Sequence, residues 1–545
     1  MSSQQFDGST LDLSRTGTDG MGGKGDLAFA PIPTLTLLFH PQARRVGARA
    51  YLGQIVRGRE ARLGRLEPDF EQPGSQEPLN DPYLSRRPIR FLPVPGGIEI
   101  RLDEGHTRIA VNGEPVDGGR VLSLAEIRDG AVLEMAGRVV LLLHLFVAPR
   151  LPVRERHGLI GESSAIAQVR AEIDRVADLA VPVLIRGATG TGKELVAQAI
   201  HAASRRSRGP FVSVNLGAIP PSLAASELFG AARGAYTGAV QAQDGYFRKA
   251  QGGTLFLDEI GETPQEVQAS LLRALETGEI QPVGAQSALR VDARVLAATD
   301  ADLEQRVQAG TFREPLLHRL AGYSIRLPPL RERRDDIGRL LVHFLRQELA
   351  ATGELEILDR DSPRLLWMKP ALMARLARYG WPGNVRQLRN AVRQLVIGSR
   401  GLPQLQSSPG FESLLGGGGR LVEAGAGPPA AAAAAMAVSD PVPSSRPAAV
   451  RRRKPADISQ DELLAVLRAH RWRLKRAAEE LGISRPSLYV LIERCPAIRK
   501  AGDLKVEEIV LCHRECGGDL DLMVERLKVS RDALHRRTRE LGLVS

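Results

Sequence analysis

The sequence predicts a chain of three folded parts: a β-sandwich, then an α/β domain with a helical lid, then an all-α helix-turn-helix region. Short alternating or apolar runs, broken by glycine, proline and Asn-Gly, fill the first part. Strands followed by glycine loops and helices fill the middle part. Near the end, one helical segment occurs twice at an offset of 46 residues, which indicates two copies of one unit.

The first part divides into a tail and a domain. Residues 1–30 are rich in glycine, serine and aspartate, which predicts disorder. Residues 31–150 contain the runs that predict the β-sandwich, at 34–39, 61–66, 89–91, 98–102, 108–111 and 139–147. The run 139–147 contains His144 and is too short to span a bilayer. We therefore expect it to be a buried strand and expect no membrane partner.

The middle part begins at residue 159 and extends to about 330. Its β-branched or apolar runs predict a parallel sheet, and they lie at 183–185, 211–214, 254–257 and 294–298. Helical patterns predict a lid over 331–400. Residues 401–456 contain a glycine run, an alanine run and several prolines, which predict a flexible linker. The two tandem helical units would occupy 457–545.

The charge of the chain favours a polyanionic partner. The formal net charge is +11, and residues 451–502 hold 13 basic against 6 acidic side chains. Residues 503–545 hold 8 basic against 9 acidic side chains. Because clustered basic residues are the electrostatic footprint of nucleic-acid binding, we expect double-stranded DNA to bind the first of the two units.

The three cysteines indicate a reducing compartment. Cys495, Cys512 and Cys516 are too few and too unevenly spaced for a disulfide framework. His513 lies beside Cys512, but two thiols and one imidazole make a poor metal site, so buried free thiols are favoured over zinc. The N-terminus has no apolar signal-peptide core, and we expect a cytoplasmic protein.

A glycine loop predicts a nucleotide site. Residues 187–194 are Gly-Ala-Thr-Gly-Thr-Gly-Lys-Glu. A glycine-rich turn between a strand and a helix directs backbone N–H groups at phosphates, and Lys193 would reach the β- and γ-phosphates of ATP. Glu194 stands where the general pattern has a serine or threonine for magnesium. The predicted ATP-binding residues of this loop are Gly187, Ala188, Thr189, Gly190, Thr191, Gly192, Lys193 and Glu194.

An acidic pair completes this site. Asp258 and Glu259 end the apolar run 254–257, where Asp258 would hold Mg²⁺ and Glu259 would polarise the attacking water. The alternative is an ordinary exposed acidic end of a strand. The glycine loop upstream favours the catalytic interpretation, with ATP and Mg²⁺ as cofactors.

The segment between these two motifs identifies a family. Residues 234–239 are Gly234, Ala235, Tyr236, Thr237, Gly238 and Ala239. With this loop inserted, residues 159–400 resemble the AAA+ ATPases that activate bacterial sigma-54 RNA polymerase. In that family the loop usually has phenylalanine at the Tyr236 position and grips the sigma factor. The resemblance therefore implies that these six residues contact sigma-54; the alternative is a plain glycine turn, although exposed aromatics often mark interaction sites.

The same resemblance assigns residues around the nucleotide. Gly-Lys-Glu, ending at Glu194, is what the family itself carries. Asn215 matches the asparagine that pairs with the catalytic glutamate. Thr299 occupies the first sensor, and Asp300 follows it where the family usually has asparagine. A carboxylate near the γ-phosphate adds repulsion, so slower hydrolysis is expected.

Three arginines also match family positions. Arg313 and Arg319 lie in the segment that supplies two arginine fingers, and Arg386 ends Trp-Pro-Gly-Asn-Val-Arg, the second sensor that reaches the nucleotide from the lid. Because fingers act on a neighbouring subunit, the resemblance implies a ring, a hexamer in this family. The alternative for Arg313 and Arg319 is a pair of surface salt bridges.

The C-terminal region resembles the Fis-type helix-turn-helix of these activators. Ala477, Ala478 and Leu481 would face inward and Gly482 would permit the turn. The second copy has Lys528 in place of that glycine, so it would read DNA weakly or serve in dimerisation. The candidate DNA-contacting residues of the first copy are Arg485, Ser487 and Tyr489.

The N-terminal part resembles a forkhead-associated (FHA) domain, a class that binds phosphothreonine. The resemblance rests on Leu-Gly-Arg ending at Arg65, on residues 81–87 and on 111–113. Pro88 replaces the usual histidine of that class, and Arg108-Ile109 replaces its Asn-Gly. The candidate phosphate-binding residues are Arg65, Ser85 and Arg86.

Together these features imply a cytoplasmic transcription activator that hydrolyses ATP to open sigma-54 polymerase complexes, under the control of the FHA-like domain. Two alternatives remain. One is a non-catalytic DNA-bound regulator whose ATPase is crippled by Asp300. The other is an AAA+ remodeller of a different target.

Overall fold

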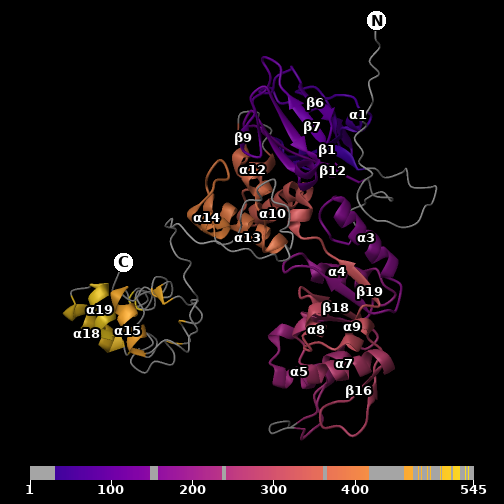
Figure 1. Ribbon diagram of the computed structural model, residues 1–545. Coiled ribbons are helices and arrows are strands. Elements are labelled where there is room, and N and C mark those ends of the chain that lie inside the picture. The colour runs from indigo at the N-terminus through magenta and orange to yellow at the C-terminus, as the bar shows by residue number, and fades with distance from the viewer. Residues whose placement is uncertain are drawn as a thin grey trace, which may run out of the picture. The chain divides into compact units, whose positions relative to one another are not determined.

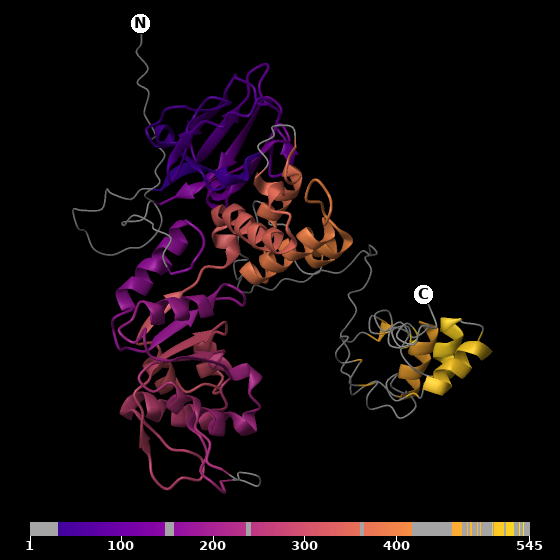
Figure 2. The same cartoon turned by 180° about the vertical axis from the view of Figure 1, so that it is seen from behind.

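The computed structural model describes residues 31–147, 157–235, 241–359, 365–416 and parts of 460–538. The chain divides into two compact units, Met1–Pro429 and Ala430–Ser545, and each is described by itself. The first unit contains a β-domain, an α/β core and a helical lid (Figures 1 and 2). Among the described helices, none is long and apolar enough to cross a membrane.

Two antiparallel sheets form the β-domain, residues 31–147. The larger sheet has the order β5-β4-β2-β1-β12-β11-β8-β9, and the smaller has the order β10-β7-β6-β3. The strands are β1 Ile32–Phe39, β2 Arg49–Tyr51, β3 Ala61–Leu63, β4 Phe70–Gln72, β5 Ser75–Glu77, β6 Ile89–Val94, β7 Gly97–Arg101, β8 Ile109–Val111, β9 Glu114–Pro115, β10 Gly119–Ser123, β11 Ala131–Met135 and β12 Val139–Phe146. Short helices α1 Gly53–Val56 and α2 Leu124–Asp129 interrupt them.

One hydrophobic cluster joins the two sheets of the β-domain. It includes Leu37 of β1 and Leu133 of β11 from the larger sheet, and Phe91 of β6 and Ile100 of β7 from the smaller. All four side chains are fully buried. Side chains from the two sheets thus share one core. The sequence predicted a β-sandwich for this part, and the structure shows antiparallel sheets there.

The strand predicted over 61–66 is shorter in the structure. It ends at Leu63 because the chain turns there, and the Gly64 N–H donates to the Glu67 carbonyl at 2.6 Å. Strands β2, β4, β5, β9, β10 and β11 were not predicted. Most of them are two or three residues long, too short to show a period of two in sequence.

A five-stranded parallel sheet forms the α/β core, in the order β14-β15-β18-β13-β19. Its strands are β13 Val183–Arg186, β14 Phe211–Asn215, β15 Thr254–Asp258, β18 Arg294–Thr299 and β19 Tyr323–Arg326. The helices are α3 Ser164–Val176, α4 Lys193–Ala202, α5 Pro221–Phe229, α6 Tyr246–Lys249, α7 Gln265–Thr277, α8 Leu303–Gln308 and α9 Glu314–Leu320. A small hairpin consists of β16 Glu279–Ile280 and β17 Leu289–Arg290.

Both faces of this sheet are covered. Leu255 and Leu257 of β15 belong to one hydrophobic cluster, whereas Phe256 between them belongs to another. Parallel strands buried on both faces are apolar at consecutive positions, which is why four of these five strands could be predicted from short apolar runs.

The lid packs as a bundle. Its helices are α10 Ile337–Thr352, α11 Glu356–Asp359, α12 Pro370–Arg378, α13 Asn384–Gly398 and α14 Pro409–Gly416. Phe411 and Leu415 of α14 are buried in the same cluster as Leu388 and Leu395 of α13. The packed region thus extends past residue 400 into the segment predicted as linker, because two apolar side chains of that segment complete the bundle.

The second unit has one small core. Its described helices are α15 Gln460–Ala469, α18 Val506–Glu515 and α19 Leu520–Leu527. Leu467, Ala477 and Leu481 of the first repeat share a cluster with Met523 and Leu527 of the second.

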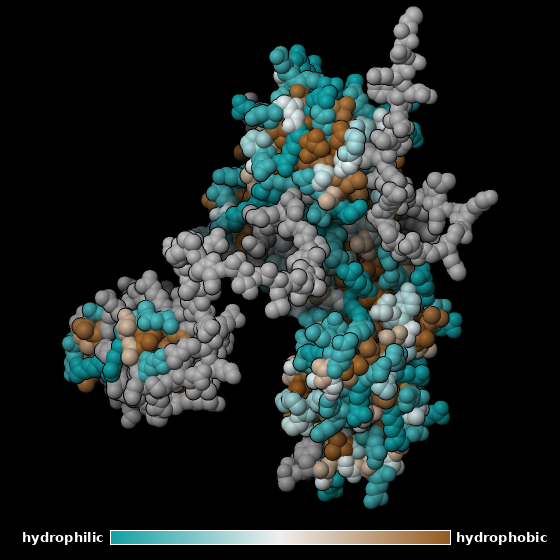
Figure 3. Space-filling view, in the orientation of Figure 1, coloured by the Kyte–Doolittle hydropathy of each residue, from teal (hydrophilic) through white to brown (hydrophobic). Residues whose placement is uncertain are grey.

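In Figure 3 the visible described surface of the molecule is mostly hydrophilic, with apolar residues scattered among polar ones.

Candidate ATP site and the loops around it

The glycine loop lies at the carboxyl edge of the parallel sheet. It follows β13 and leads into α4. Gly190 and Gly192 have φ angles of +79° and +106°, a region that favours glycine. Ligands of open parallel sheets bind outside the carboxyl ends of the strands. The loop is therefore in the place where phosphates would meet its N–H groups and the start of a helix.

Lys193 is held within the loop. It is the first residue of α4, it is largely buried, and its Nζ donates to the Gly187 carbonyl at 2.8 Å. Thr191 Oγ1 donates to the Ala188 carbonyl at 2.8 Å. Glu194, by contrast, is exposed on α4. An amine anchored in this way would neutralise phosphate charge once nucleotide fills the loop.

The acidic pair lies beside the loop. Asp258 is paired in register with Asn215 of β14, so both end at the same sheet edge. Asp258 Oδ1 accepts from the Glu259 N–H at 3.0 Å, and Glu259 adopts a left-handed φ of +57°. Its carboxylate lies over Gly217, where an added Cβ would be 2.1 Å from Oε2. Glycine at 217 therefore leaves the space that the carboxylate occupies.

Asn215 makes a different bond from the one predicted. Its Oδ1 accepts from the Ala218 N–H at 3.1 Å, which caps the short helical turn Leu216–Ala218. Among the described residues no hydrogen bond joins Asn215 to Glu259. Their pairing as a nucleotide switch stays a prediction. Both side chains lie near Gly217, where an added Cβ would be 2.1 Å from Glu259 Oε2 and 3.4 Å from Asn215 Oδ1.

The two residues at the first-sensor position contact the glycine loop. The Thr299 carbonyl accepts from the Gly187 N–H at 3.2 Å, and Thr299 Oγ1 accepts from the Ala301 N–H at 3.0 Å. Asp300 Oδ2 accepts from Thr189 Oγ1 at 2.5 Å. The carboxylate that departs from the family pattern is therefore bonded to the loop that would hold the phosphates.

The lid also reaches this loop. The Arg386 N–H donates to the Gly190 carbonyl at 3.3 Å, which places the second-sensor arginine beside the loop. Asn384 Nδ2 donates to the Thr189 carbonyl at 2.9 Å, and its Oδ1 accepts from the Leu330 N–H at 2.8 Å. The lid and the core are thus joined at the nucleotide site.

Two of the residues that join them were missed in the sequence. Asn384 is buried, with a φ of +50°, a value that asparagine tolerates better than most residues. Arg333 Nη2 donates to the Thr191 carbonyl at 3.4 Å, and burial lowers the pKa of this guanidinium. The one available signal was the position of Asn384 inside the Trp-Pro-Gly-Asn-Val-Arg segment, which was assigned for its arginine alone.

Both candidate finger arginines lie on the surface of the core. Arg313 precedes α9 and Arg319 lies on it, and both are exposed. Arg319 Nε donates to the Leu275 carbonyl of α7 at 3.2 Å. Within the described residues, no hydrogen bond joins either guanidinium to the glycine loop of the same chain. This exposure is compatible with action on a neighbouring subunit.

Backbone pairing fixes the base of the candidate sigma-contacting loop. Ala231 exchanges two hydrogen bonds with Gln243, and the Ala232 N–H donates to the Val283 carbonyl at 2.9 Å. Gly234, with a φ of +79°, and Ala235 begin the loop. Four of the predicted contact residues lie outside the described residues: Tyr236, Thr237, Gly238 and Ala239.

Family comparisons agree with this geometry. Residues 159–326 match the sigma-54 interaction domain, and residues 331–403 match the AAA+ ATPase lid domain. The chain carries a sigma-54 interaction ATPase domain with its lid. Residues 454–493 match the Fis family of bacterial regulatory proteins, so a Fis-type helix-turn-helix region follows that ATPase domain.

Individual relatives share the ATPase part. Over 258 residues the chain is 49% identical to the DNA-binding transcriptional regulator NtrC of Escherichia coli (strain K12), a match that covers 47% of this chain and 53% of NtrC. It is 47% identical over 249 residues to the anaerobic nitric oxide reductase transcription regulator NorR of Salmonella paratyphi B, covering 46% and 47%. The chain spans about half the length of these curated relatives.

A solved structure of NtrX from Brucella abortus in complex with ATP is also similar to this chain. The sequence identity is 31%, and the match covers 70% of this chain and 69% of NtrX, with a TM-score of 0.41.

Two of the residues predicted to face inward in the helix-turn-helix unit are among the described residues. Ala477 and Leu481 are buried in the core of the unit, as predicted. Cys512 is buried there too, with its Sγ 3.8 Å from that of Cys516, and burial raises the pKa of the Cys512 thiol to about 11. The DNA-contacting candidates Arg485, Ser487 and Tyr489 lie outside the described residues.

In the β-domain, the loops that carry the candidate phosphate-binding residues come together. The Arg65 N–H donates to the Ser85 carbonyl at 3.2 Å. The Ser85 N–H donates to Thr107 Oγ1 at 2.8 Å, and its Oγ donates to the Gly105 carbonyl at 2.9 Å. Arg86 is exposed. Arg65 and Ser85 are thus brought together, with Arg86 next to Ser85 in sequence.

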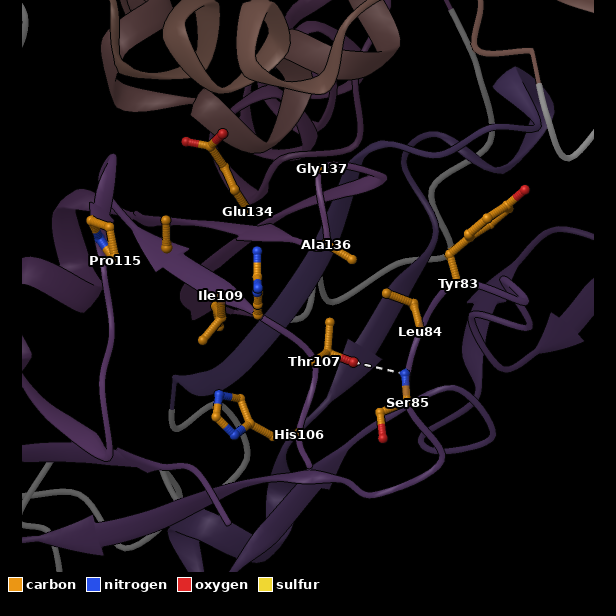
Figure 4. A pocket seen from close by; sticks show the side chains of 12 residues that line it. Tyr83, Leu84, Ser85, His106, Thr107, Ile109, Pro115, Glu134, Ala136 and Gly137 are labelled. Carbon is orange, nitrogen blue, oxygen red and sulfur yellow. Dashed lines mark hydrogen bonds between the residues drawn. The ribbon is translucent and has the colours of Figure 1, made fainter. Parts of the chain in front are cut away.

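These loops border a cavity of about 750 Å³ (Figure 4). Ser85 and Thr107 line it from one side, and Ile109 and Glu134 line it from the neighbouring strands β8 and β11. A buried ion pair fixes the loop before Ser85, since Arg138 Nη2 donates to Asp81 Oδ2 at 2.9 Å. The polar rim therefore has a rigid support.

Proposed function

We propose that this protein is a cytoplasmic sigma-54-dependent transcription activator. It would bind double-stranded DNA through its C-terminal unit and use ATP hydrolysis to remodel sigma-54 RNA polymerase into the open complex. The observation that carries the proposal is the assembly of glycine loop, acidic pair and lid residues at one edge of the sigma-54 interaction domain. NtrC and NorR, which share that domain, are transcription regulators.

The residues have distinct roles in this proposal. The loop N–H groups and Lys193 hold the phosphates, Glu259 orients the attacking water, and Asp258 offers a carboxylate of the kind that Mg²⁺ prefers. Bound Mg²⁺ would neutralise charge that develops on the phosphates. Asn215 and Thr299 would report the state of the nucleotide to the rest of the domain.

The proposal includes a ring of subunits, and the exposure of two arginines supports it. Arg313 and Arg319 would stabilise the transition state in the next subunit, and Arg386 would do so from the lid of the same subunit. Because Arg313 and Arg319 would act on the nucleotide of a neighbouring subunit, the proposal includes a hexamer as the active form, the ring that these activators form.

Loss of the Thr237 hydroxyl is expected to separate hydrolysis from activation. Thr237→Ala lies in the sigma-contacting loop and leaves every residue of the ATP site in place. We expect near-normal ATPase activity and no ATP-dependent open complex on a sigma-54 promoter. The matched control is Ser226→Ala in α5, because this hydroxyl bonds within its own helix to the Leu223 carbonyl. Open-complex formation by Thr237→Ala would show that the target is engaged elsewhere.

Replacing Asp300 with asparagine is expected to raise ATP turnover. The amide keeps an acceptor for Thr189 and removes a negative charge next to the phosphate loop. Relief of one like charge near the protein surface is worth on the order of 1 kcal/mol, so a rise of about fivefold is expected. Steady-state ATPase assays check it, with Asp292→Asn as the control because this carboxylate precedes β18 and pairs with Arg206. Unchanged or slower turnover would contradict this account, and no turnover in the parent chain would favour the non-catalytic alternative.

DNA recognition is expected to reside in the first helical repeat. Arg485→Ala should weaken specific binding by about 1–3 kcal/mol if this side chain meets a guanine edge. Arg531→Ala, the equivalent change in the second repeat, should cost less because that repeat has no basic surplus. Footprinting and binding titrations at one salt concentration check both variants. The reverse order of effects would make the second repeat the reader.

We also propose that the β-domain is FHA-like and binds a phosphothreonine protein. Its support is the backbone hydrogen bond from Arg65 to Ser85, together with the cavity in Figure 4 that Ser85 lines. Phosphate oxygens would accept from Ser85 and from the guanidinium groups of Arg65 and Arg86. Titration with a phosphothreonine peptide and its unphosphorylated counterpart tests this: equal affinity for both would reject it.

A further inference from the structure

Three strands of the β-domain supply side chains to two different hydrophobic cores. Leu141 and Leu143 of β12 face the interior of the β-domain, whereas Val140 and Leu142 belong to another cluster. The same division holds for β11, with Leu133 on the inner side and Val132 on the outer. An antiparallel sheet usually keeps one face toward solvent. Here both faces of its central strands are buried.

The lid covers that outer face. Leu38, Val132, Val140 and Leu142 of the β-domain lie in one continuous cluster with apolar side chains of α10, α12 and α13. The lid members of this cluster include Leu340, Leu341, Met373, Ala377, Leu388 and Val392. Figures 1 and 2 show the lid helices α10 and α12 against the β-domain. The two domains therefore share a core, as the parts of one domain do.

The backbones approach closely where α10 crosses β1. A Cβ added at Gly338 of α10 would be 2.9 Å from Val46 Cγ1 and 3.0 Å from the Leu38 carbonyl oxygen. The Phe39 and Trp367 rings lie 4.5 Å apart between centroids, and Trp367 Nε1 donates to the His40 carbonyl at 2.9 Å. Contacts at these distances oppose sliding of the lid along the β-domain.

Polar contacts surround the shared core. Arg339 Nη2 of α10 donates to the Gly47 carbonyl at 2.9 Å, and Arg378 Nη1 of α12 donates to the Asn112 carbonyl at 2.7 Å. Both acceptors are backbone groups of the β-domain, so the contacts fix the position of its chain as well as of its side chains.

Residues 333–336, the hinge segment that connects the core to the lid, also contact the β-domain. Arg49 of β2 pairs with Asp335 at 2.9 Å, and both side chains are more than nine-tenths buried. The next residue, Asp336, accepts from the N–H groups of Glu162 and Ser163 at 2.6 and 3.0 Å. Arg333 precedes Asp335 by two residues, and its Nη2 donates to the Thr191 carbonyl in the glycine loop. One four-residue segment thus contacts the β-domain, the start of the ATPase core and the phosphate loop.

We propose that the β-domain and the lid move over the ATP site as one rigid body, and that Arg49 is a positioning residue for nucleotide binding. Domains joined by small polar interfaces move relative to each other, whereas large apolar interfaces prevent this. The shared core is of the second kind. Arg49 would act through Asp335, which sets the hinge that carries Arg333 to the glycine loop. The proposal concerns nucleotide binding and does not depend on the sigma-54 target.

Distance measurements between spin labels test the rigid body. The labels go on Val121→Cys of β10 and Ile397→Cys of α13, both 58% exposed, in a full-length chain whose Cys495, Cys512 and Cys516 are replaced by serine. We expect one narrow distance distribution that is the same with and without a non-hydrolysable ATP analogue. A broad distribution, or a shift when the analogue binds, would overturn the proposal.

Affinity measurements test Arg49. Arg49→Met removes the charge that faces Asp335, and we expect the dissociation constant of a fluorescent ATP analogue to rise about tenfold, the scale of coupling between contacting groups. Arg62→Met is the matched control, because Arg62 lies on the surface of β3 and pairs with Glu60. Arg49→Lys, which keeps the charge but loses the planar fork, should show a smaller rise.

Two measurements together distinguish a positioning role of Arg49 from a purely structural one. Thermal unfolding of each variant is measured beside the affinity. Lower thermal stability with unchanged nucleotide affinity, in Arg49→Met or in Arg49→Lys if the first does not fold, would show that Arg49 only stabilises the β-domain. Weakened affinity in the Arg49 variants alone would support the positioning role.

Discussion

Replacing Glu259 with glutamine is expected to leave ATP bound and almost unhydrolysed. The side chain keeps its size over Gly217, but an amide cannot take a proton from water. Loss of a general base costs about a hundredfold to ten-thousandfold in rate. The measurement is single-turnover hydrolysis together with nucleotide affinity, with Glu262→Gln as the control because that carboxylate pairs with Arg306 at the surface.

Lys193→Ala is expected to lose activity at an earlier step, the binding of nucleotide. The amine that bonds to the Gly187 carbonyl is the positive charge within the phosphate loop 187–194, so its loss should abolish nucleotide binding itself. The two variants are distinguished by affinity: Glu259→Gln binds and Lys193→Ala does not. Tight binding by Lys193→Ala, or ordinary turnover by Glu259→Gln, would remove the assigned roles.

Removing either finger arginine is expected to slow hydrolysis by about a thousandfold or more, the effect of losing a charge that stabilises phosphoryl transfer in trans. Arg313 just before α9 and Arg319 on α9 are both exposed, so neither change disturbs a core. Nucleotide affinity should fall much less than turnover. Arg101→Ala, an exposed arginine paired with Glu99 on β7, serves as the control.

Mixing two inactive variants tests whether the arginines act between subunits. Arg319→Ala subunits retain Glu259, and Glu259→Gln subunits retain the arginines. In mixed rings, a subunit with an intact base can receive an intact finger from its neighbour, so activity should reappear. If the mixture stays inactive while each variant still assembles, the arginines would act within their own subunit or not at all.

The α/β core could be predicted because its signals are local. The glycine loop needs residues without a Cβ at Gly190 and Gly192, and the acidic pair must follow an apolar strand. Both requirements can be recognised in short runs of consecutive residues. The parallel strands, buried on both faces, also appear as short apolar runs. The place of Asp258 at the end of its strand followed from these local signals, whereas Asn215 and Thr299 were assigned from the family resemblance.

The bonds that connect domains could not be predicted. Asn384 contacts Thr189 across 195 positions, and Arg49 contacts Asp335 across 286. No local pattern distinguishes such residues from exposed polar ones, because their partners are set by tertiary packing. The short strands β4, β5 and β9 were missed for a related reason: pairing with neighbours, rather than their own residues, makes them strands.

The double-sided burial of β1, β11 and β12 bears on how such proteins can be recombined. A sensory domain with a polar exterior can be exchanged between regulators as a cassette. Here a graft at the boundary near residue 157 would leave Val132, Val140 and Leu142 without cover on one fragment and Leu340, Leu341 and Met373 without cover on the other. Exposed apolar patches of that kind promote aggregation. The β-domain and the lid would therefore have to be inherited, or transplanted, together.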